Sequence, residues 1–393
     1  MTRGPKVNGR PAWAEVSLGA LRYNLKAIRR HIGRKRKVLC IVKANAYGHG
    51  AAGVSKALEK AGADWFGVTC AAEGAELREA GIRKPILVLT GFWPGEEEAL
   101  LRYRLTPAIT QLEQLRLLER AVAKKRSKQP TGFHLKIDTG MNRLGVTPAD
   151  LPRFVRALAD CPHLQLAGTF THFASAEDFT HDQTERQEKA FAASLAQLRA
   201  AGLDPGITHL ANSAGIAARP STWADMVRPG AILYGYHQFY NPPEQESEMK
   251  AKLPLRPVLS LHARIILLRD VPAGQGVGYN GRFVARRDSR VAVIASGYAD
   301  GLVRQRSNGD LNAGARSRVI VNGRCAPLVG TISMDLAMVD VTDVPGARVG
   351  DVCTIYGKDG CAIYPSDVAR ELHTVTSDLL CAIGKRVPRF YVA

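Results

Sequence analysis

Residues 38–235 alternate between short apolar segments and helical segments, and this alternation constrains the fold more than any other feature of the sequence. Eight segments are apolar and rich in β-branched residues, as is typical of strands covered on both faces. They are residues 38–44, 64–69, 85–89, 106–110, 132–138, 164–172, 207–212 and 225–235. Eight strands alternating with helices predict an α/β fold, a (β/α)8 barrel of the TIM type. A doubly wound sheet is the alternative, but no G-x-G-x-x-G motif follows the first strand.

The pattern changes near residue 238. Residues 238–257 are polar and contain four prolines, which predicts a linker. After it, strand patterns alternate with Gly, Asn and Asp turns, which predicts a mostly-β domain. We therefore expect a barrel domain over residues 1–240 and a mostly-β domain over residues 241–393. Residues 1–16 contain a strand-like stretch that can pair with the second domain instead.

Charge and composition narrow the classes of partner. The net charge is +18, but the basic runs at 29–37, 124–128 and 304–309 are dispersed and not interleaved with aromatic residues. This disfavours nucleic-acid binding. The seven cysteines form no C-x-x-C pair, which favours mostly reduced thiols. No apolar run is long enough to span a membrane, and the start of the chain is basic and polar, so we expect a cytoplasmic protein.

Polar residues recur where the predicted strands end. In a (β/α)8 barrel those ends meet at one mouth, where catalytic residues gather. The residues in question are Lys43, Lys136, Asp138, Arg143, His172, His209, Asn212, Ser213, Arg228 and Gly230. Each has a structural alternative: Lys43 can reach solvent from a strand end, His172 can be a core histidine, residues 138–145 can be a plain loop, and residues 209–215 can be a helix N-cap. The functional interpretation rests on their joint occurrence.

A lysine in an apolar barrel mouth suggests a chemistry. Burial disfavours the charged ammonium, so the pKa of such a lysine falls and its neutral amine can form a Schiff base. A helix N-cap near residues 212 and 213 can bind a phosphate through free backbone N–H groups. Pyridoxal phosphate is an aldehyde that carries a phosphate and uses a lysine in this way.

The stretch "VKANAYGHG", residues 42–50, resembles the lysine motif of fold-type III pyridoxal-phosphate enzymes, and specifically of the alanine racemase family. The resemblance continues in order through nearly the whole chain. The further blocks are "KIDTGMNRLG", "THFASAE", "HLANSAG", "VRPGAILYG", "GVGYNG", "IASGYADG" and "GTISMDLAMVDV".

The resemblance implies a two-base racemisation of alanine. Lys43 would carry pyridoxal 5'-phosphate and act as one base, while Tyr279 would act as the other. Tyr279 and Met334 would come from the partner subunit of a head-to-tail homodimer. Racemisation removes a proton from one face of the α-carbon and returns one on the other, which two opposed bases can do. The product D-alanine would supply cell-wall peptidoglycan.

The resemblance also implies roles for residues around the cofactor. Arg143 and Met334 would meet the substrate, and Lys136 would be carbamylated to hold Arg143. Arg228 would face the pyridine nitrogen, and His172 would connect Arg228 to Tyr279. The remaining cofactor contacts would be Tyr47, Asn212, Ser213, Gly230, Ala231 and Ser377. No metal is implied.

Two positions depart from the family pattern. Ser377 stands where a tyrosine is usual, and Thr331 stands where an arginine is common. Both changes would widen or neutralise the substrate entrance, which predicts relaxed specificity toward serine. The alternatives are a broad-specificity amino-acid racemase, a decarboxylase or aldolase of the same fold type, and a non-catalytic pyridoxal-phosphate-binding protein. Tyr279 and the second domain argue against them.

Overall fold

The computed structural model describes residues 9–125, 129–308 and 317–393. Predictions for residues 1–8, and for the ends of the basic runs at 124–128 and 304–309, lie partly outside these residues. The chain forms two compact units. The barrel unit contains residues 20–46 and 51–256, and the β unit contains the N-terminal segment up to Gly19, Tyr47–Gly50 and Pro257–Ala393. The domain limits drawn from the sequence stay a prediction.

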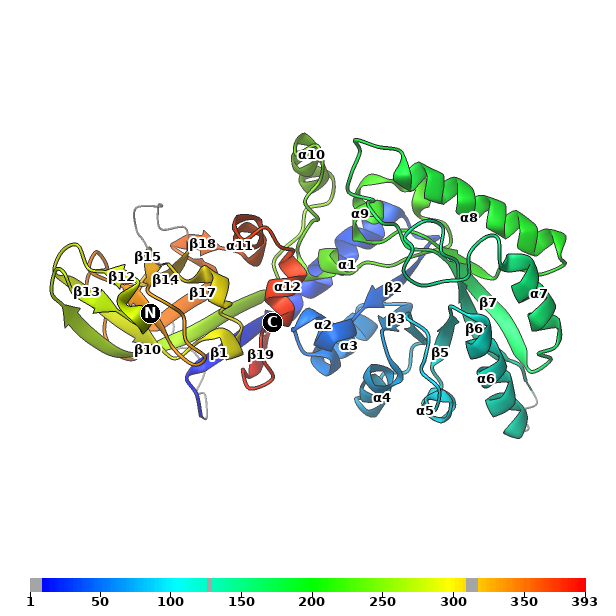
Figure 1. Ribbon diagram of the computed structural model, residues 1–393, viewed down its shortest axis with the longest axis horizontal. Coiled ribbons are helices and arrows are strands. Elements are labelled where there is room, and N and C mark those ends of the chain that lie inside the picture. The colour runs from blue at the N-terminus through cyan, green and yellow to red at the C-terminus, as the bar shows by residue number, and fades with distance from the viewer. Residues whose placement is uncertain (1–8, 126–128, 309–316) are drawn as a thin grey trace. The chain divides into compact units, whose positions relative to one another are not determined.

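The barrel unit contains the eight predicted parallel strands in a nearly closed ring, which confirms the predicted fold (Figure 1). The strands are β2 (Lys37–Ile41), β3 (Trp65–Val68), β4 (Ile86–Val88), β5 (Thr106–Ile109), β6 (Thr131–Lys136), β7 (Leu164–Phe170), β8 (Ile207–His209) and β9 (Met226–Val227). Their order is β8-β7-β6-β5-β4-β3-β2-β9. Backbone bonds from the Asp225 N–H to the Thr208 carbonyl and from the Arg228 N–H to the Ala211 carbonyl connect the two ends of this sheet.

Helices lie on the outside of these strands (Figure 1). They are α1 (Leu18–Ile32), α3 (Ala51–Lys60), α4 (Ala71–Glu79), α5 (Glu97–Arg102), α6 (Leu112–Lys124), α7 (Leu151–Ala159), α8 (Gln183–Ala200), α9 (Ser213–Ala218) and α10 (Glu244–Lys252), with short 3-10 helices η1 (Pro220–Thr222) and η2 (Ala231–Tyr234). In α1, Leu21, Leu25, Ile28 and Ile32 form the buried stripe that its periodicity predicts. The segment predicted to be a linker, residues 238–257, contains the helix α10, which Glu-to-Lys pairs at four-residue spacing support.

The β unit is built on a nine-stranded sheet of order β18-β17-β14-β15-β16-β13-β10-β1-β19. Its strands are β1 (Ala12–Ser17), β10 (Leu259–Val271), β13 (Ser289–Ile294), β14 (Arg318–Val321), β15 (Arg324–Val329), β16 (Ala337–Asp340), β17 (Val352–Asp359), β18 (Cys361–Ile363) and β19 (Arg389–Val392). β10 also pairs with β17, so the sheet curls back on itself. The N-terminal strand β1 lies between β10 and β19 in this sheet.

Smaller elements complete the β unit. They are the strand pair β11 (Gly276–Val277) and β12 (Phe283–Val284), the helices α11 (Pro365–Glu371) and α12 (Thr376–Cys381), and the 3-10 helices η3 (Tyr279–Gly281), η4 (Tyr298–Asp300) and η5 (Arg304–Arg306). A disulfide joins Cys325 of β15 to Cys361 of β18. The other five cysteines are free thiols, so the thiols are mostly reduced, as predicted, and this pair is the exception.

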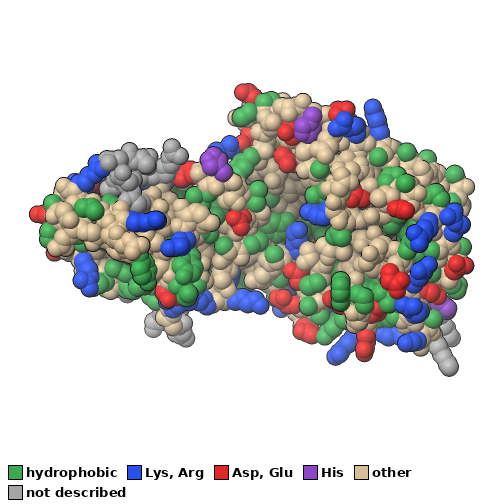
Figure 2. All heavy atoms as spheres, viewed as in Figure 1, with side chains coloured by type: hydrophobic (Ala, Val, Ile, Leu, Met, Phe, Trp, Pro, Cys, Tyr) green, Lys and Arg blue, Asp and Glu red, His purple; other side chains and the backbone are tan. Residues whose placement is uncertain are grey.

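The surface and the helices bear on possible partners. On the face that Figure 2 shows, Lys and Arg side chains are scattered among acidic and hydrophobic ones rather than gathered into one patch. Among the described residues, no helix is both long and apolar enough to cross a bilayer.

Candidate active site at the mouth of the barrel

Lys43 follows the first barrel strand and begins a left-handed turn. β2 ends at Ile41, three residues before the end of the predicted strand at residues 38–44, and Tyr234 Oη donates to the Ile41 carbonyl. Ala44, Asn45 and Ala46 then have φ of 51°, 54° and 54°, and Tyr47 has φ of 52°. This conformation costs residues other than glycine roughly 1–2 kcal/mol each. The surrounding structure therefore has to hold the turn in place.

Several bonds hold the turn. The Ala46 N–H donates to the Val42 carbonyl across it, at 2.8 Å. The Ala44 N–H donates to Glu73 Oε1 at 2.6 Å, and the Asn45 side chain accepts from the Ala51 N–H at the start of α3. Gly48 and Gly50 follow with φ of 77° and 93°, values that glycine adopts without steric cost, so the chain can turn tightly toward α3.

Four cationic side chains share the barrel mouth. Burial, together with the positive charges of Arg143, Arg228 and Lys43, lowers the pKa of Lys136 to about 8, although Asp138 opposes them. Burial first, and then the four cations, hold the pKa of His172 well below its usual range. The structure therefore brings Lys43, Lys136, Arg143, His172 and Arg228 together, as the strand-end reasoning predicts.

Arg228 makes several hydrogen bonds within the barrel mouth. It is buried, and burial lowers the pKa of its guanidinium to about 9. Its terminal nitrogens donate to the carbonyls of Thr171, His209 and Leu210 at 2.7–2.8 Å. They also lie 3.1 and 3.2 Å from Nδ1 of His209 and Nδ1 of His172. No bond in the described part of the chain uses its Nε, which remains as a donor for a ligand.

Arg228 fixes the tautomers of its histidine neighbours. A guanidinium can only donate, so Nδ1 of both His172 and His209 must accept, and their protons lie on Nε2. Nε2 of His209 is 2.9 Å from Nδ1 of His134, to which it therefore donates. Burial lowers the pKa of His134 to about 3, so this histidine is neutral. The result is a chain of hydrogen bonds from Arg228 into the barrel interior.

His134 is the member of this chain that the sequence analysis missed. It lies within β6 and is buried, and its ring lies near Trp65 and His209. The sequence places His209 at a strand end but gives it no role. Its ring stacks on that of Phe170, with the two ring centroids 4.6 Å apart. The available signal was a histidine inside the apolar run "GFHLKID", which is an unusual place for an imidazole without a partner.

The loop after β6 is organised by one carboxylate. Asp138 Oδ1 accepts from the backbone N–H groups of Gly140, Met141 and Asn142, and Oδ2 accepts from that of Arg143. Although burial raises the pKa of Asp138, these four bonds outweigh it and lower the pKa overall. The loop is therefore not a plain connection, because it fixes the backbone from which the exposed Arg143 side chain extends.

Small residues gather where β8 and β9 end. Asn212 is the N-cap of α9 and accepts from the Gly215 N–H, as the structural alternative predicts. The buried Ser213 Oγ accepts from the Gly230 N–H at 2.9 Å. Gly230 in turn precedes η2, which begins at Ala231. The four residues Asn212, Ser213, Gly230 and Ala231 therefore lie together where these two strands end.

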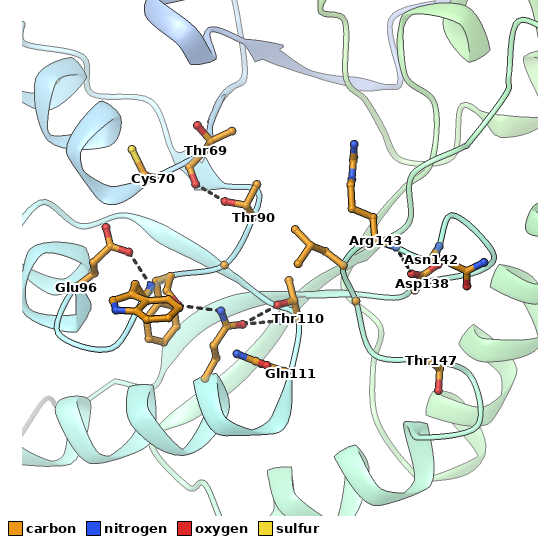
Figure 3. Close-up of a pocket in the computed structure, with 16 residues that line it drawn as sticks. Thr69, Cys70, Thr90, Glu96, Thr110, Gln111, Asp138, Asn142, Arg143 and Thr147 are labelled. Atoms are coloured by element: carbon orange, nitrogen blue, oxygen red, sulfur yellow. Dashed lines mark hydrogen bonds between the residues drawn. The ribbon is translucent and has the colours of Figure 1, made fainter.

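A pocket of about 720 Å³ lies on the other flank of the mouth (Figure 3). Residues from the ends of β3, β4, β5 and β6 line it. Thr69 and Thr90 stand on one side, joined by a bond from Thr90 Oγ1 to the Thr69 carbonyl, and Arg143 stands on the other. Of the strand-end residues predicted to lie at the mouth, Asp138 and Arg143 line this open volume.

The other predicted site residues belong to the β unit. Tyr279 in η3 and Met334 are 66% and 52% exposed, unusual values for large apolar side chains. Ser377 lies in α12, and a Cβ on Gly48 would lie 2.1 Å from the Leu380 carbonyl oxygen of the same helix. The segment that begins at Tyr47 therefore packs on the helix of Ser377, and burial raises the pKa of Tyr47. Thr331 is buried.

The barrel mouth suits pyridoxal phosphate. Four cations crowded in one half-buried site repel one another, so an anionic ligand relieves the repulsion. The cofactor brings a phosphate, an amino-acid substrate brings a carboxylate, and Arg228 Nε is an available donor for a ring nitrogen. Lys43 supplies the amine. Among the described residues, no cluster of His, Cys, Asp and Glu could hold a metal ion.

Comparison with known proteins finds the same family along nearly the whole chain. The family model "Alanine racemase, N-terminal domain" matches residues 16–238, and "Alanine racemase, C-terminal domain" matches residues 258–391. A curated alanine racemase of Geobacter sulfurreducens is 39% identical over 391 residues, with 98% of each chain covered.

Similar solved structures come from the same family. The biosynthetic alanine racemase from Pseudomonas aeruginosa is 37% identical, with a TM-score of 0.82, and 98% of this chain and 100% of that chain are covered. The alanine racemase from Bartonella henselae with covalently bound pyridoxal phosphate is 30% identical, with a TM-score of 0.84 and the same coverage. With its barrel, its β unit and its cationic mouth, the chain belongs to the alanine racemase family.

Proposed function

We propose that this protein interconverts L-alanine and D-alanine with pyridoxal phosphate, using two bases on opposite faces of the α-carbon. The observation that carries the proposal is the mouth itself, where Lys43 starts a fixed turn beside Lys136, Arg143 and Arg228. When bound, the cofactor acidifies the α-proton of the amino acid by withdrawing electrons. The residues of the chain hold the reactants and move the proton.

Each group at the mouth has a chemical task in this proposal. Lys43 binds the cofactor and serves one face of the α-carbon. Ser213, Asn212, Gly230, Ala231 and Tyr47 hold its phosphate. Arg228 donates to the pyridine nitrogen, and a guanidinium keeps that nitrogen unprotonated because it does not readily give up a proton. This makes the ring a weaker electron sink, which limits side reactions such as transamination.

Lys136 and Arg143 form the substrate end of the site. A lysine with a pKa of about 8 has a substantial neutral fraction near neutral pH, and a neutral amine reacts with carbon dioxide to give a carbamate. We propose that Lys136 is carbamylated. The resulting anion would hold Arg143, whose guanidinium would then be aimed at the substrate carboxylate. Bicarbonate-free buffer should lower activity, and added bicarbonate should restore it.

The second base is proposed to come from another subunit. Tyr279 and Met334 are exposed in the protomer, and His172 carries its proton on Nε2, where it can donate to a tyrosine oxygen. We propose a head-to-tail homodimer in which Tyr279 and Met334 complete the partner's site. A donated hydrogen bond stabilises the phenolate and so suits Tyr279 as a base.

Subunit mixing tests this arrangement. Lys43→Ala and Tyr279→Phe should each abolish activity. If the sites are shared, reassociating equal amounts of the two should restore about a quarter of the wild-type activity, because half of the dimers are mixed and each has one intact site. No recovery in dimers shown to have mixed would contradict the shared site.

The cofactor assignment has its own test. The purified enzyme should show the absorbance of lysine-bound pyridoxal phosphate and should remove the optical rotation of L-alanine. Lys43→Ala should lose both. Lys37→Ala is the matched control, because Lys37 is the exposed first residue of the same strand. An unchanged absorbance band in Lys43→Ala would overturn the assignment.

We further propose a widened substrate entrance. Ser377 is shorter than tyrosine and lies on the helix against which the segment after Tyr47 packs. A hydrophobic substrate pocket rejects one added hydroxyl only weakly, by about 10²-fold. Ser377→Tyr should therefore raise the ratio of kcat/KM for alanine to that for serine. An unchanged ratio would refute the role of Ser377 at the entrance.

We also propose that the enzyme works in the cytoplasm and supplies D-alanine for peptidoglycan. Its family membership supports this. The gene should rescue growth of a bacterium that requires D-alanine, and cell fractionation should recover the protein with cytoplasmic markers. Failure to rescue, although the protein is present and active in extracts, would contradict this role.

A further inference from the structure

Glu73 joins the turn of the cofactor lysine to the neighbouring barrel strands. It is the third residue of α4, which follows β3 around the barrel. Its Oε1 accepts from the Ala44 N–H at 2.6 Å, one residue after Lys43. Its Oε2 accepts from both the N–H and the Oγ of Thr69 at 2.8 Å, at the end of β3. One carboxylate thus accepts three hydrogen bonds that connect two strand ends.

The bond to Ala44 is placed where it matters for Lys43. The Ala44 N–H belongs to the peptide that leaves Lys43, and Ala44 is the first residue with left-handed φ and ψ. Non-glycine residues do not hold this conformation by themselves. A charge-assisted hydrogen bond to the first peptide of the turn therefore fixes where the Lys43 backbone, and with it the side chain, points.

The connection continues across the mouth. The carbonyl of Thr69 accepts from Thr90 Oγ1, at the end of the next strand (Figure 3). Thr69 and Thr90 line the same pocket as Arg143. Glu73 is therefore part of a hydrogen-bonded series that runs from the lysine turn to the ends of β3 and β4.

We propose that Glu73 is a positioning residue for Lys43, acting through the Ala44 amide to hold the lysine in the orientation from which it binds the cofactor and serves its face of the substrate. This rests on the proposed function of Lys43. A purely local role is the alternative, because an acidic residue in the first turn of a helix also stabilises that helix.

Two conservative variants separate these roles. Glu73→Gln keeps the shape, but its single carbonyl oxygen can accept from Ala44 or from Thr69, not from both ends, and its NH2 must then face an N–H donor. Glu73→Asp keeps the charge in the first turn of α4 but is one methylene shorter, so it cannot span the two strand ends. Glu76→Ala is the control, since Glu76 is exposed on the same helix.

The first readout is the release of the cofactor. Pyridoxal phosphate should leave the Glu73→Gln and Glu73→Asp holoenzymes about tenfold faster than it leaves wild type, the effect expected for one charge-assisted hydrogen bond. Glu76→Ala should match wild type. In the holoenzyme, peptides that contain residues 43–47 should also exchange their amide hydrogens faster in the two Glu73 variants.

The second readout is the α-deuterium isotope effect, which reports on proton transfer at each face of the α-carbon. A displaced Lys43 slows only the transfer in which the lysine takes part, so the α-deuterium isotope effect should rise for one enantiomer of alanine and not for the other. A merely structural loss, in which less enzyme is folded, leaves both isotope effects unchanged.

These outcomes separate the positioning role of Glu73 from the proposed role of Lys43 in binding the cofactor. If both Glu73 variants match Glu76→Ala in release, exchange and isotope effects, Glu73 does not position Lys43. If Glu73→Asp alone matches wild type, the charge at the start of α4 suffices and the proposal is again wrong. If Lys43→Ala keeps the absorbance band of the bound cofactor, the proposed function itself fails. Should Glu73→Gln not fold, Glu73→Asp still decides the question.

Discussion

Lys136 offers a sharp test of the electrostatics of the barrel mouth. Its amine is nearly buried, and burial with Arg143 and Arg228 lowers its pKa from 10.5 to about 8. The charged form is therefore disfavoured in the folded protein. Below pH 8 both folded and unfolded chains are protonated, and the folded state is destabilised by about 3 kcal/mol, since one pKa unit corresponds to about 1.4 kcal/mol.

Lys136 should make the free energy of unfolding depend on pH. Between pH 8 and 10.5 the unfolded chain binds more protons at this residue than the folded chain does, so stability rises with pH. Lys136→Met removes the free-energy cost of burying the ammonium. It should therefore stabilise the protein by about 3 kcal/mol at pH 7 but by less than about 1 kcal/mol at pH 10. The measurement is denaturant unfolding of the wild-type and Lys136→Met holoenzymes at matched pH, in buffer free of carbon dioxide.

Two results would refute this reasoning. If the difference in unfolding free energy between the two proteins does not change between pH 7 and pH 10, the pKa of Lys136 is not lowered. If Lys136→Met is less stable than wild type at pH 7, the ammonium is better paired than the structure indicates. Bicarbonate provides an internal check, because carbamylation replaces the cation by an anion and should stabilise only the wild type.

Three other substitutions test separate parts of the structure. Gly48→Ala should destabilise the protein by more than about 2 kcal/mol, because a Cβ would lie 2.1 Å from the Leu380 oxygen, whereas Gly62→Ala, with φ of 96° and nothing within 4 Å, should show only the backbone strain of about 1 kcal/mol in thermal unfolding. Arg228→Met leaves the carbonyls of Thr171, His209 and Leu210 without this donor and should lower the free energy of unfolding by at least about 3 kcal/mol; a near-neutral effect would show that these carbonyls find other donors. Cys325→Ser should lower it by about 3–4 kcal/mol under oxidising conditions, from a loop of 36 residues, and by little under reducing ones.

The strands of the barrel were predictable because a buried parallel strand leaves a plain record. Both of its faces are covered, so segments such as residues 38–41 and 86–88 are continuously apolar. The site was predictable for a related reason: the strand ends meet at one mouth, so Lys43, Lys136, His172 and Arg228 could be grouped without knowledge of their contacts. The resemblance then supplied roles, which composition and periodicity could not.

The left-handed turn after Lys43 could not be predicted in the same way. Alanine has no preference for positive φ, and "KANAY" contains no glycine. What holds the turn lies elsewhere, in Glu73, 29 residues further along the chain from Ala44. His134 was missed for the same reason, since its partner His209 is 75 residues away and lies on another strand.

The charge pattern of the mouth explains why its histidines cannot share the work of its lysines. Arg228 donates to Nδ1 of His172 and His209, and burial together with the neighbouring cations lowers the pKa of both rings. Neither ring can take up a proton readily, because it would create another cation beside those already present. His172 is thereby confined to donating from Nε2, which suits it to orient a neighbouring oxygen and not to act as a base. The two proposed bases, Lys43 and Tyr279, therefore lie outside this chain of histidines, whose proposed role is to orient the groups around them.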